Sequence, residues 1–460
     1  MVANWVWAVV SIGIIVLAMI IGLIVLLIAS RRARKVAAEA AASRPSDELF
    51  AVAQPGEAAP LKRVWIIANP TKPVDYLEFR RIVSQAVIEA TGQPAMWIES
   101  TVKDPGTGQA IEALKHNPSL VIAAGGDGTV RAVAAGMAHS NVPMGLLPMG
   151  TGNLLARNLE LPLDLEKALK VALGPLDRPI DLAWMRLERV TEKPEIPAEG
   201  KLLLKAKASE TRALPKGVVE PLKDEFAYTV IAGVGFDGET MAQTTPELKK
   251  KVGWTAYVFT ALKSLWIERL RATVTIFHDE GDEASDFVPQ RRGKIPRKVE
   301  GAVRQSHTIG APDGVSPASS SGDTWDMTSL RARTILFANC GTLPFAVLAP
   351  QAEMDDGKLD VIAIDTRGGL FGWMYLTAKV WGQSAGVKPL NLKNDVGSIQ
   401  FRQTTSARVD LASPYPVQID GDPIGSAQTI LARVDRHALI IRVPVPLDEE
   451  VQATTPSQQG

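Results

Sequence analysis

The chain contains 460 residues, which is enough for two or three domains with cores of their own. Lysine and arginine together number 50, and so do aspartate and glutamate, so the overall charge gives no support for a nucleic-acid partner. Cys340 is the only cysteine, which excludes a disulfide within the chain and fits a reducing compartment.

The first patterned segment is a long apolar run near the N-terminus. Residues 5–30 carry no charged side chain, and the run exceeds the about 20 residues that a helix needs to cross a bilayer. The basic segment RRARK, residues 31–35, follows the run, whereas a signal peptide would carry positive charge before it. Because basic flanks stay in the cytoplasm, we expect a single-pass helix in the cell membrane, with the N-terminus outside and the bulk of the chain in the cytoplasm. Residues 1–60 are predicted to form this anchor and an Ala-, Glu-, Ser- and Pro-rich tether.

Residues 61–180 are predicted to form an α/β domain that binds a nucleotide. Apolar runs typical of buried strands occupy residues 63–68, 95–100, 119–126 and 143–148, and helical spacing occupies residues 76–91, 107–116 and 129–139. Alternating strands and helices indicate a parallel sheet with helices on both faces. Ligands of such sheets bind beyond the carboxyl ends of the strands, so the loops that follow the strands should converge on one edge.

Residues 181–446 are predicted to form a second, mostly antiparallel β domain. Its expected strands occupy residues 180–190, 226–237, 271–279, 331–341, 358–365, 407–422 and 431–445. Polar insertions are predicted at about residues 191–224 and 280–324, the second as a long loop or disordered segment. Two helices are expected at residues 253–270 and 370–383, and residues 447–460 are expected to be a disordered tail.

A glycine-rich segment lies between the third predicted strand and the helix that follows it. In Gly125-Gly126-Asp127-Gly128-Thr129, missing Cβ atoms would let backbone N–H groups approach phosphate oxygens, and the positive end of the helix would add to the attraction. The dinucleotide fingerprint would need glycine at position 131, where arginine stands, and no lysine follows as in a P-loop. The segment is therefore a phosphate loop of another type, or a structural turn.

A second loop of similar composition follows the fourth predicted strand. Gly150-Thr151-Gly152-Asn153 also opens a helical segment. Thr151 and Asn153 could donate hydrogen bonds to phosphate, or they could cap the helix. Two such loops at neighbouring strand ends favour a shared anion site.

Five motifs in this order carry a resemblance to a known family. NPTK, GGDGTV, PMGTGNLLARNLELP, DDGKLDV and QIDGDPIG, spread over residues 62–446, together resemble the diacylglycerol kinase catalytic family, which includes bacterial lipid kinases, ceramide kinases and sphingosine kinases. GGDGT also occurs in NAD kinases and phosphofructokinase-like folds, so it does not decide the substrate. The GTGN segment, with Ala-Arg and Leu-Pro behind it, is more similar to lipid kinases.

The resemblance implies an ATP site, with Mg²⁺ as a second cofactor. The residues implied to bind the nucleotide are Asn69, Pro70, Thr101, Gly125, Gly126, Asp127, Gly128, Thr129, Thr151, Gly152 and Asn153. For Asp127 we consider three roles, namely orienting the loop, holding the magnesium of ATP, and a local turn contact.

The resemblance also implies a metal site and a general base. In EMDDGKLDV, Asp356 would give a carboxylate to a structural Mg²⁺, with the backbone carbonyls of Glu353 and Lys358 nearby. Asp-Asp-Gly is equally typical of a hairpin turn. Many bacterial relatives carry Asp-Gly-Glu where this chain has Asp420-Gly421-Asp422. Asp422 is thus the predicted general base, one methylene shorter than the glutamate.

The expected function is transfer of the γ-phosphate of ATP to a lipid hydroxyl, with diacylglycerol converted to phosphatidic acid. A positioned carboxylate would accept the hydroxyl proton. The expected partner is a membrane lipid at the inner face of the membrane, and the anchor would keep the site at a high effective concentration of that lipid. Alternatives are a kinase of ceramide, of a sphingoid base or of another lipid alcohol, an NAD kinase-like enzyme, and a membrane-anchored regulatory module with an inactive site. A homodimer is left open.

Overall fold

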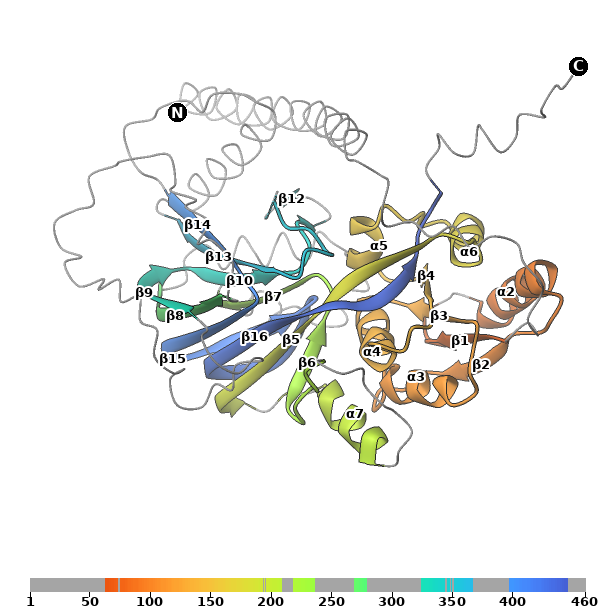
Figure 1. Ribbon diagram of the computed structural model, residues 1–460, viewed down its shortest axis with the longest axis horizontal. Coiled ribbons are helices and arrows are strands. Elements are labelled where there is room, and N and C mark those ends of the chain that lie inside the picture. The colour runs from red at the N-terminus through yellow and green to blue at the C-terminus, as the bar shows by residue number, and fades with distance from the viewer. Residues whose placement is uncertain are drawn as a thin grey trace, which may run out of the picture. The chain divides into compact units, whose positions relative to one another are not determined.

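A computed structural model gives the fold (Figure 1). It describes residues 63–72, 75–192, 194, 196–208, 218–235, 269–278, 324–343, 346–347, 349, 351–366 and 397–445. Among these residues, no helix has the length and apolar character needed to cross a bilayer. The apolar run at 5–30, the tether, the tail, the insertion before residue 324 and most of the helices expected at 253–270 and 370–383 lie outside the described residues.

A parallel sheet forms the first half of the fold. Its strands are β1 (Val64–Ala68), β2 (Met96–Glu99), β3 (Leu120–Gly125) and β4 (Met144–Pro148), in the order β2-β1-β3-β4. All three neighbouring pairs run parallel. The side chains of β1 and β3 are buried along their whole length, as a sheet covered on both faces requires. The predicted α/β architecture is confirmed.

Helices cover both faces of this sheet (Figure 1). They are α2 (Tyr76–Thr91), α3 (Thr107–Leu114), α4 (Asp127–Met137), α5 (Leu154–Asn158) and α6 (Leu165–Ala172). Helices α2 and α6 share one apolar core with alternate residues of β1 and β3, and α3 and α4 pack against the sheet and each other. The Asp75 side chain caps the start of α2, and Gly92 ends it with a φ of 69°.

The second half is mostly antiparallel, as predicted. Its strands are β5 (Asp177–Glu192), β6 (Glu225–Tyr228), β7 (Ile231–Gly235), β8 (Leu270–His278), β9 (Thr324–Ala332), β10 (Thr334–Ala338), β13 (Leu359–Thr366), β14 (Gly397–Thr404), β15 (Ser406–Ile419) and β16 (Asp422–Arg442). A separate ribbon pairs β11 (Thr342–Leu343) with β12 (Ala346–Val347). The long strand β16 pairs with β5 and β15 and also reaches the parallel sheet, where Ile441 pairs with Met144 of β4. The two halves therefore share one mixed sheet.

Several details differ from the sequence expectation. The expected strand at 226–237 is wrong as a single element, because β6 ends at Tyr228 and β7 begins at Ile231, and a carboxylate described below binds the backbone amides between them. The expected strand at 407–422 likewise runs past the end of β15 into β16, and β9 and β14 lie mostly or wholly outside the expected strands. The insertion at about 191–224, polar as a whole, contains a helix, α7 (Glu199–Ala208).

Candidate active site

The glycine segment joins β3 to α4 in a turn that excludes side chains. A Cβ on Gly125 would lie 2.6 Å from Cβ of Thr129, and one on Gly126 would lie 3.3 Å from Cα of Gly150. Gly126 is the N-cap of α4, and no side chain caps this helix. The first amides of α4 therefore begin a helix of 11 residues without a protein carboxylate or hydroxyl on them, as an anion site at a helix N-terminus requires.

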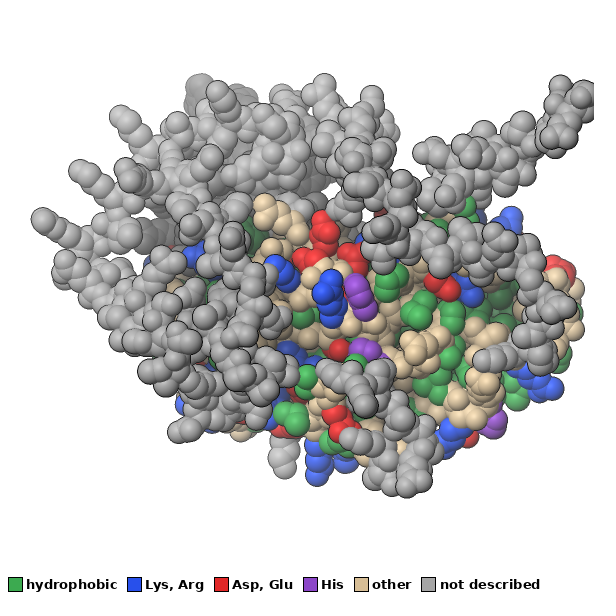
Figure 2. All heavy atoms as spheres, viewed as in Figure 1, with side chains coloured by type: hydrophobic (Ala, Val, Ile, Leu, Met, Phe, Trp, Pro, Cys, Tyr) green, Lys and Arg blue, Asp and Glu red, His purple; other side chains and the backbone are tan. Residues whose placement is uncertain are grey.

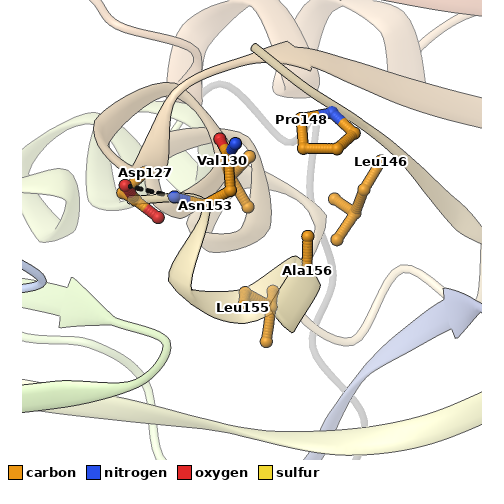
Figure 3. Close-up of a pocket in the computed structure, with 7 residues that line it drawn as sticks. All are labelled: Asp127, Val130, Leu146, Pro148, Asn153, Leu155 and Ala156. Atoms are coloured by element: carbon orange, nitrogen blue, oxygen red, sulfur yellow. Dashed lines mark hydrogen bonds between the residues drawn. The ribbon is translucent and has the colours of Figure 1, made fainter. Parts of the chain in front are cut away.

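Asp127 ties the two loops together. Its Oδ2 accepts a hydrogen bond from the amide of Asn153 at 3.0 Å, and its Oδ1 accepts one from the amide of Leu154 at 2.5 Å; Figure 3 shows the contact with Asn153. Burial, followed by the charges of Asp420 and Asp422, raises the pKa of Asp127 to about 6 despite these two hydrogen bonds. Of the three roles considered for Asp127, the contacts match the orienting one.

Asn153 holds its own loop closed. Its side chain accepts a hydrogen bond from the Gly150 amide and donates one to the Gly150 carbonyl, both at 2.8 Å, and its φ is 49°. A Cβ on Gly152 would lie 2.7 Å from Oδ2 of Asp127, so glycine is needed there for the carboxylate to approach. The amides that open α5 are thus occupied by protein groups, and Thr151 is left exposed at the tip of the loop.

Behind these loops lies a narrow, mostly apolar pocket (Figure 3). It is lined by Asp127, Val130, Leu146, Pro148, Asn153, Leu155 and Ala156. The side chains of β4, α4 and α5 close it, which leaves the pocket too narrow for a nucleotide base. Asp127 and Asn153, one residue from each loop, are among the residues that line it.

The segment after β1 lies beside the glycine segment. Nδ2 of Asn69 is 3.5 Å from Oγ1 of Thr129, and Oδ1 of Asn69 accepts hydrogen bonds from the amide and hydroxyl of Thr71. A Cβ on Gly126 would lie 3.6 Å from Cε and 3.8 Å from Nζ of Lys72. Lys72 is the last residue of the NPTK motif, and the sequence indicates no role for it. Its ammonium group lies beside the glycine segment.

Thr101 stands apart from this group. Its amide donates to the carbonyl of Asp104 at 2.9 Å, and its hydroxyl accepts from the amide of Asp104 at 3.1 Å. Among the described residues no hydrogen bond joins Thr101 to the glycine segment. It lies at the carboxyl end of β2, and its contact with a nucleotide stays a prediction.

Asp422 reaches the glycine segment from the second half of the chain. It begins β16 after a two-residue turn in which Asp420 and Gly421 have φ values of 46° and 88°, as the type I′ turn of an Asp-Gly hairpin requires. A Cβ on Gly128 would lie 3.0 Å from Oδ2 of Asp422. The predicted base and the predicted phosphate loop, far apart in the sequence, therefore meet in the structure.

Asp420 fixes this turn to the neighbouring strands. Its carboxylate accepts hydrogen bonds from the amide and hydroxyl of Thr229 and from the amides of Val230 and Ile231, all at 2.7–3.0 Å. These are the amides that separate β6 from β7. Four donors satisfy a carboxylate that is only 5% exposed.

Two further charged residues complete the site, and sequence reasoning missed both roles. Arg131 on α4 is buried and donates from Nη1 to Oδ2 of Asp422 at 2.9 Å. Its Nε lies 3.5 Å from Oε1 of Glu199, which begins α7. In the sequence, Arg131 is distinguished only by standing where the dinucleotide fingerprint would need glycine.

The expected metal turn is held by protein contacts. Oδ1 of Asp356 accepts a hydrogen bond from the amide of Lys358 at 2.8 Å, and the neighbouring Asp181 accepts one from the amide of Gly357 at 2.6 Å. Burial raises the pKa of Asp356 to about 6, with the charges of Asp181 and Glu353 adding to the effect. No cluster of three acidic, histidine or cysteine side chains suited to a metal occurs in the described part of the chain. These contacts are those of a turn before β13, although not of a hairpin, because β13 pairs with β10 and β14. Mg²⁺ at Asp356, Glu353 and Lys358 stays a prediction.

One face of the molecule carries charges of both signs. Figure 2 shows acidic, basic and histidine side chains close together near its middle, with more apolar and uncharged surface toward the α/β half. Such mixed charge matches the balanced composition of the chain.

Comparison with known proteins relates this geometry to a family. The family model of the diacylglycerol kinase catalytic domain matches residues 63–185. The resemblance expected from the sequence is thereby confirmed, and the matched region contains both glycine-containing loops. Asp356 and Asp422 lie beyond it.

Curated relatives and a solved structure agree with this match. A diacylglycerol kinase of Staphylococcus epidermidis is 34% identical over 173 residues, 37% of this chain and 51% of the relative. One of Bacillus subtilis is 36% identical over 127 residues, 26% of this chain and 41% of the relative. The chain therefore spans about half the length of the curated relatives that it matches. A crystal structure of a proposed diacylglycerol kinase from Bacillus anthracis superimposes with a TM-score of 0.51 at 15% identity, covering 85% of this chain and 98% of the other. At that identity the superposition supports the fold alone.

Proposed function

We propose that this protein is a lipid kinase that transfers the γ-phosphate of ATP to the hydroxyl of a membrane lipid, with diacylglycerol as the expected acceptor. One observation carries the proposal: Oδ2 of Asp422 lies 3.0 Å from the position of a Cβ on Gly128. A carboxylate from the second half of the chain is therefore in contact with the glycine segment of the catalytic domain. Phosphoryl transfer to an alcohol needs this pairing of an anion cradle with a proton acceptor.

On the nucleotide side, the cradle consists of backbone and one cation. Gly126 starts α4 without a capping side chain, so its first amides and the helix dipole can stabilise phosphate oxygens. The ammonium of Lys72 beside Gly126 adds a positive charge that a triphosphate would attract. Magnesium carried by ATP would supply divalent charge against the developing phosphoryl negative charge.

On the acceptor side, Asp422 is the proton acceptor. Its side chain is 34% exposed, so a hydroxyl can reach the carboxylate from outside while Arg131 holds it from inside. Removing the hydroxyl proton as the oxygen attacks phosphorus makes the oxygen a better nucleophile. Because Asp422 starts β16 directly against the glycine segment, the short side chain of aspartate reaches that segment.

The lipid nature of the acceptor rests on the relatives and on the N-terminus. The relatives named above are diacylglycerol kinases, and residues 5–30 are an uncharged apolar run followed by basic residues, typical of a single-pass anchor with the basic side in the cytoplasm. An anchored enzyme meets an acceptor confined to the bilayer at a high effective concentration.

The test is transfer of ³²P from γ-labelled ATP by the full chain in mixed micelles. Separate micelles contain diacylglycerol, ceramide, a sphingoid base or a polyprenol, and NAD is offered in solution. Labelled phosphatidic acid is expected, and it should fall at least about 100-fold in Asp422→Asn. Asp164→Asn is the matched control, because that aspartate only caps α6 and asparagine caps equally well. Another labelled lipid would change the acceptor, labelled NADP would refute a lipid kinase, and no product would favour an inactive module.

A further inference from the structure

Arg131 is a fully buried arginine whose partners come from two other parts of the chain. Its side chain is 2% exposed. Nη1 donates to Oδ2 of Asp422 at 2.9 Å and lies 3.4 Å from the carbonyl oxygen of Ile419, on the other side of the hairpin turn. Nε points to Oε1 of Glu199 at 3.5 Å. The guanidinium thus bridges the start of α4 and the start of β16.

Glu199 holds the arginine from the side away from the turn. Its side chain is 4% exposed, and its other oxygen accepts a hydrogen bond from the amide of Ala227 on β6 at 3.2 Å. A buried charge is tolerated when partners satisfy it and is costly when one partner is removed. Between two carboxylates, the planar guanidinium has little freedom to rotate.

We propose that Arg131, anchored by Glu199, is a positioning residue that fixes the carboxylate of Asp422 against the glycine segment. This inference rests on the function proposed above and adds two residues to its machinery. One oxygen of Asp422 is held between Arg131 and Gly128, with Nη2 of Arg131 only 3.9 Å from the Cβ position on that glycine. The part of Asp422 that stays exposed is the part that meets the acceptor hydroxyl.

Kinetics of single variants give the first test. Arg131→Met and Arg131→Gln should lower kcat at least about 10-fold with the KM for ATP changed less than about threefold. Glu199→Gln should lower kcat by a smaller factor. Arg81→Met and Glu112→Gln are matched controls, because both residues form exposed ion pairs within single helices. Wild-type kcat in Arg131→Gln, or a KM for ATP that rises as much as kcat falls, would refute a positioning role.

A double variant separates positioning from general stability. If Arg131 acts through Asp422, adding Arg131→Gln to Asp422→Asn should cause no further loss of kcat. A second loss as large as that in the wild-type background would mean that Arg131 acts elsewhere.

A measurement without turnover keeps this inference distinct from the proposed function. Urea unfolding of the full chain in detergent micelles compares wild type, Arg131→Gln, Asp422→Asn and the double variant. Because the two side chains are in contact, the double variant should lose less stability than the sum of the two single variants. If the wild type phosphorylates no acceptor but the two losses are not additive, the proposed function fails and the pairing of Arg131 with Asp422 stands. Additive losses overturn the inference.

Discussion

Residues of the same type serve different purposes within a few ångströms in this site. Asp420 is satisfied by four hydrogen-bond donors, Asp127 by two amides, and Asp422 by an arginine. The side chain of Asp422 is 34% exposed, whereas Asp420 is 5% exposed. The environment, and not the residue type, separates the candidate base from the structural acids.

A buried aspartate outside the site offers a test of how burial acts on stability. Asp360 on β13 is 3% exposed, and burial raises its pKa to about 6. At pH 7 it is ionised in both the folded and the unfolded chain, so the folded state carries the cost of desolvation. Below about pH 6 the folded state takes up a proton first, and the cost disappears as the pH falls toward about 4.

Asp360→Asn should therefore raise the free energy of unfolding at pH 7 by about 1–3 kcal/mol. The gain should shrink as the pH approaches about 4. Urea unfolding of the full chain at pH 7 and pH 4.5 measures both effects, with the exposed Asp224→Asn as control. A gain that is equal at the two pH values would show that the burial of charge is not the cause.

Lys72 provides a second test at this scale. Because its ammonium lies beside Gly126, Lys72→Met should raise the KM for ATP about 10-fold and change kcat less. Lys115→Met is the control, because Lys115 forms an exposed ion pair at the far end of α3. An unchanged KM for ATP together with a lowered kcat would instead assign the lysine to the transferred phosphoryl group.

Among the elements of the site, the turn between β15 and β16 is held in place by the buried carboxylate of Asp420. Asp420 connects this turn to the segment between β6 and β7 through three backbone amides and one hydroxyl. An asparagine there would place an NH₂ group against amide donors and would lose the charge-assisted hydrogen bonds.

Asp420→Asn should lower the free energy of unfolding by about 2–4 kcal/mol and should also reduce kcat, because Asp422 begins the next strand. Urea unfolding and the lipid assay measure the two effects, and Asp164→Asn is the control for an exposed helix cap. Unfolding at the wild-type urea concentration would show that the four hydrogen bonds do not stabilise the turn.

The sequence predicted those elements whose formation depends on residues that are close together in the chain. The strands of the parallel sheet are short apolar runs, and the glycine segment stands between such a run and a helix, so both could be recognised. Arg131 could not, since its partners are 68 and 291 residues away along the chain and a charged residue on a helix normally faces solvent. Glu199 was hidden in a polar segment that resembled a loop.

At the scale of the whole molecule, the main division of the chain was predictable and its connection was not. The change from alternating strands and helices to successive strands marked the two halves. The pairing of Ile441 with Met144, which joins them in one sheet, leaves no trace in composition because strand partners are chosen by tertiary packing.

The proposed membrane anchor gives a prediction for the full chain. The wild-type protein should sediment with membranes and resist extraction by alkaline carbonate. Leu17→Lys, at the centre of the apolar run, should weaken insertion by about 3 kcal/mol and release part of the protein. Ser46→Lys in the tether is the control. Wild-type protein in the supernatant would contradict the anchor.

The length of β16 has a consequence for motion. This strand of 21 residues begins with Asp422 and reaches β4 near its other end, so the spacing between base and cradle is set along one hydrogen-bonded ladder. Its regular pairing with β5 is interrupted between Asp435 and Leu439, where His437 has a φ of 49°. A strand bends most easily where its pairing is irregular. We therefore expect any rotation of one half against the other to be small and to bend β16 at this stretch.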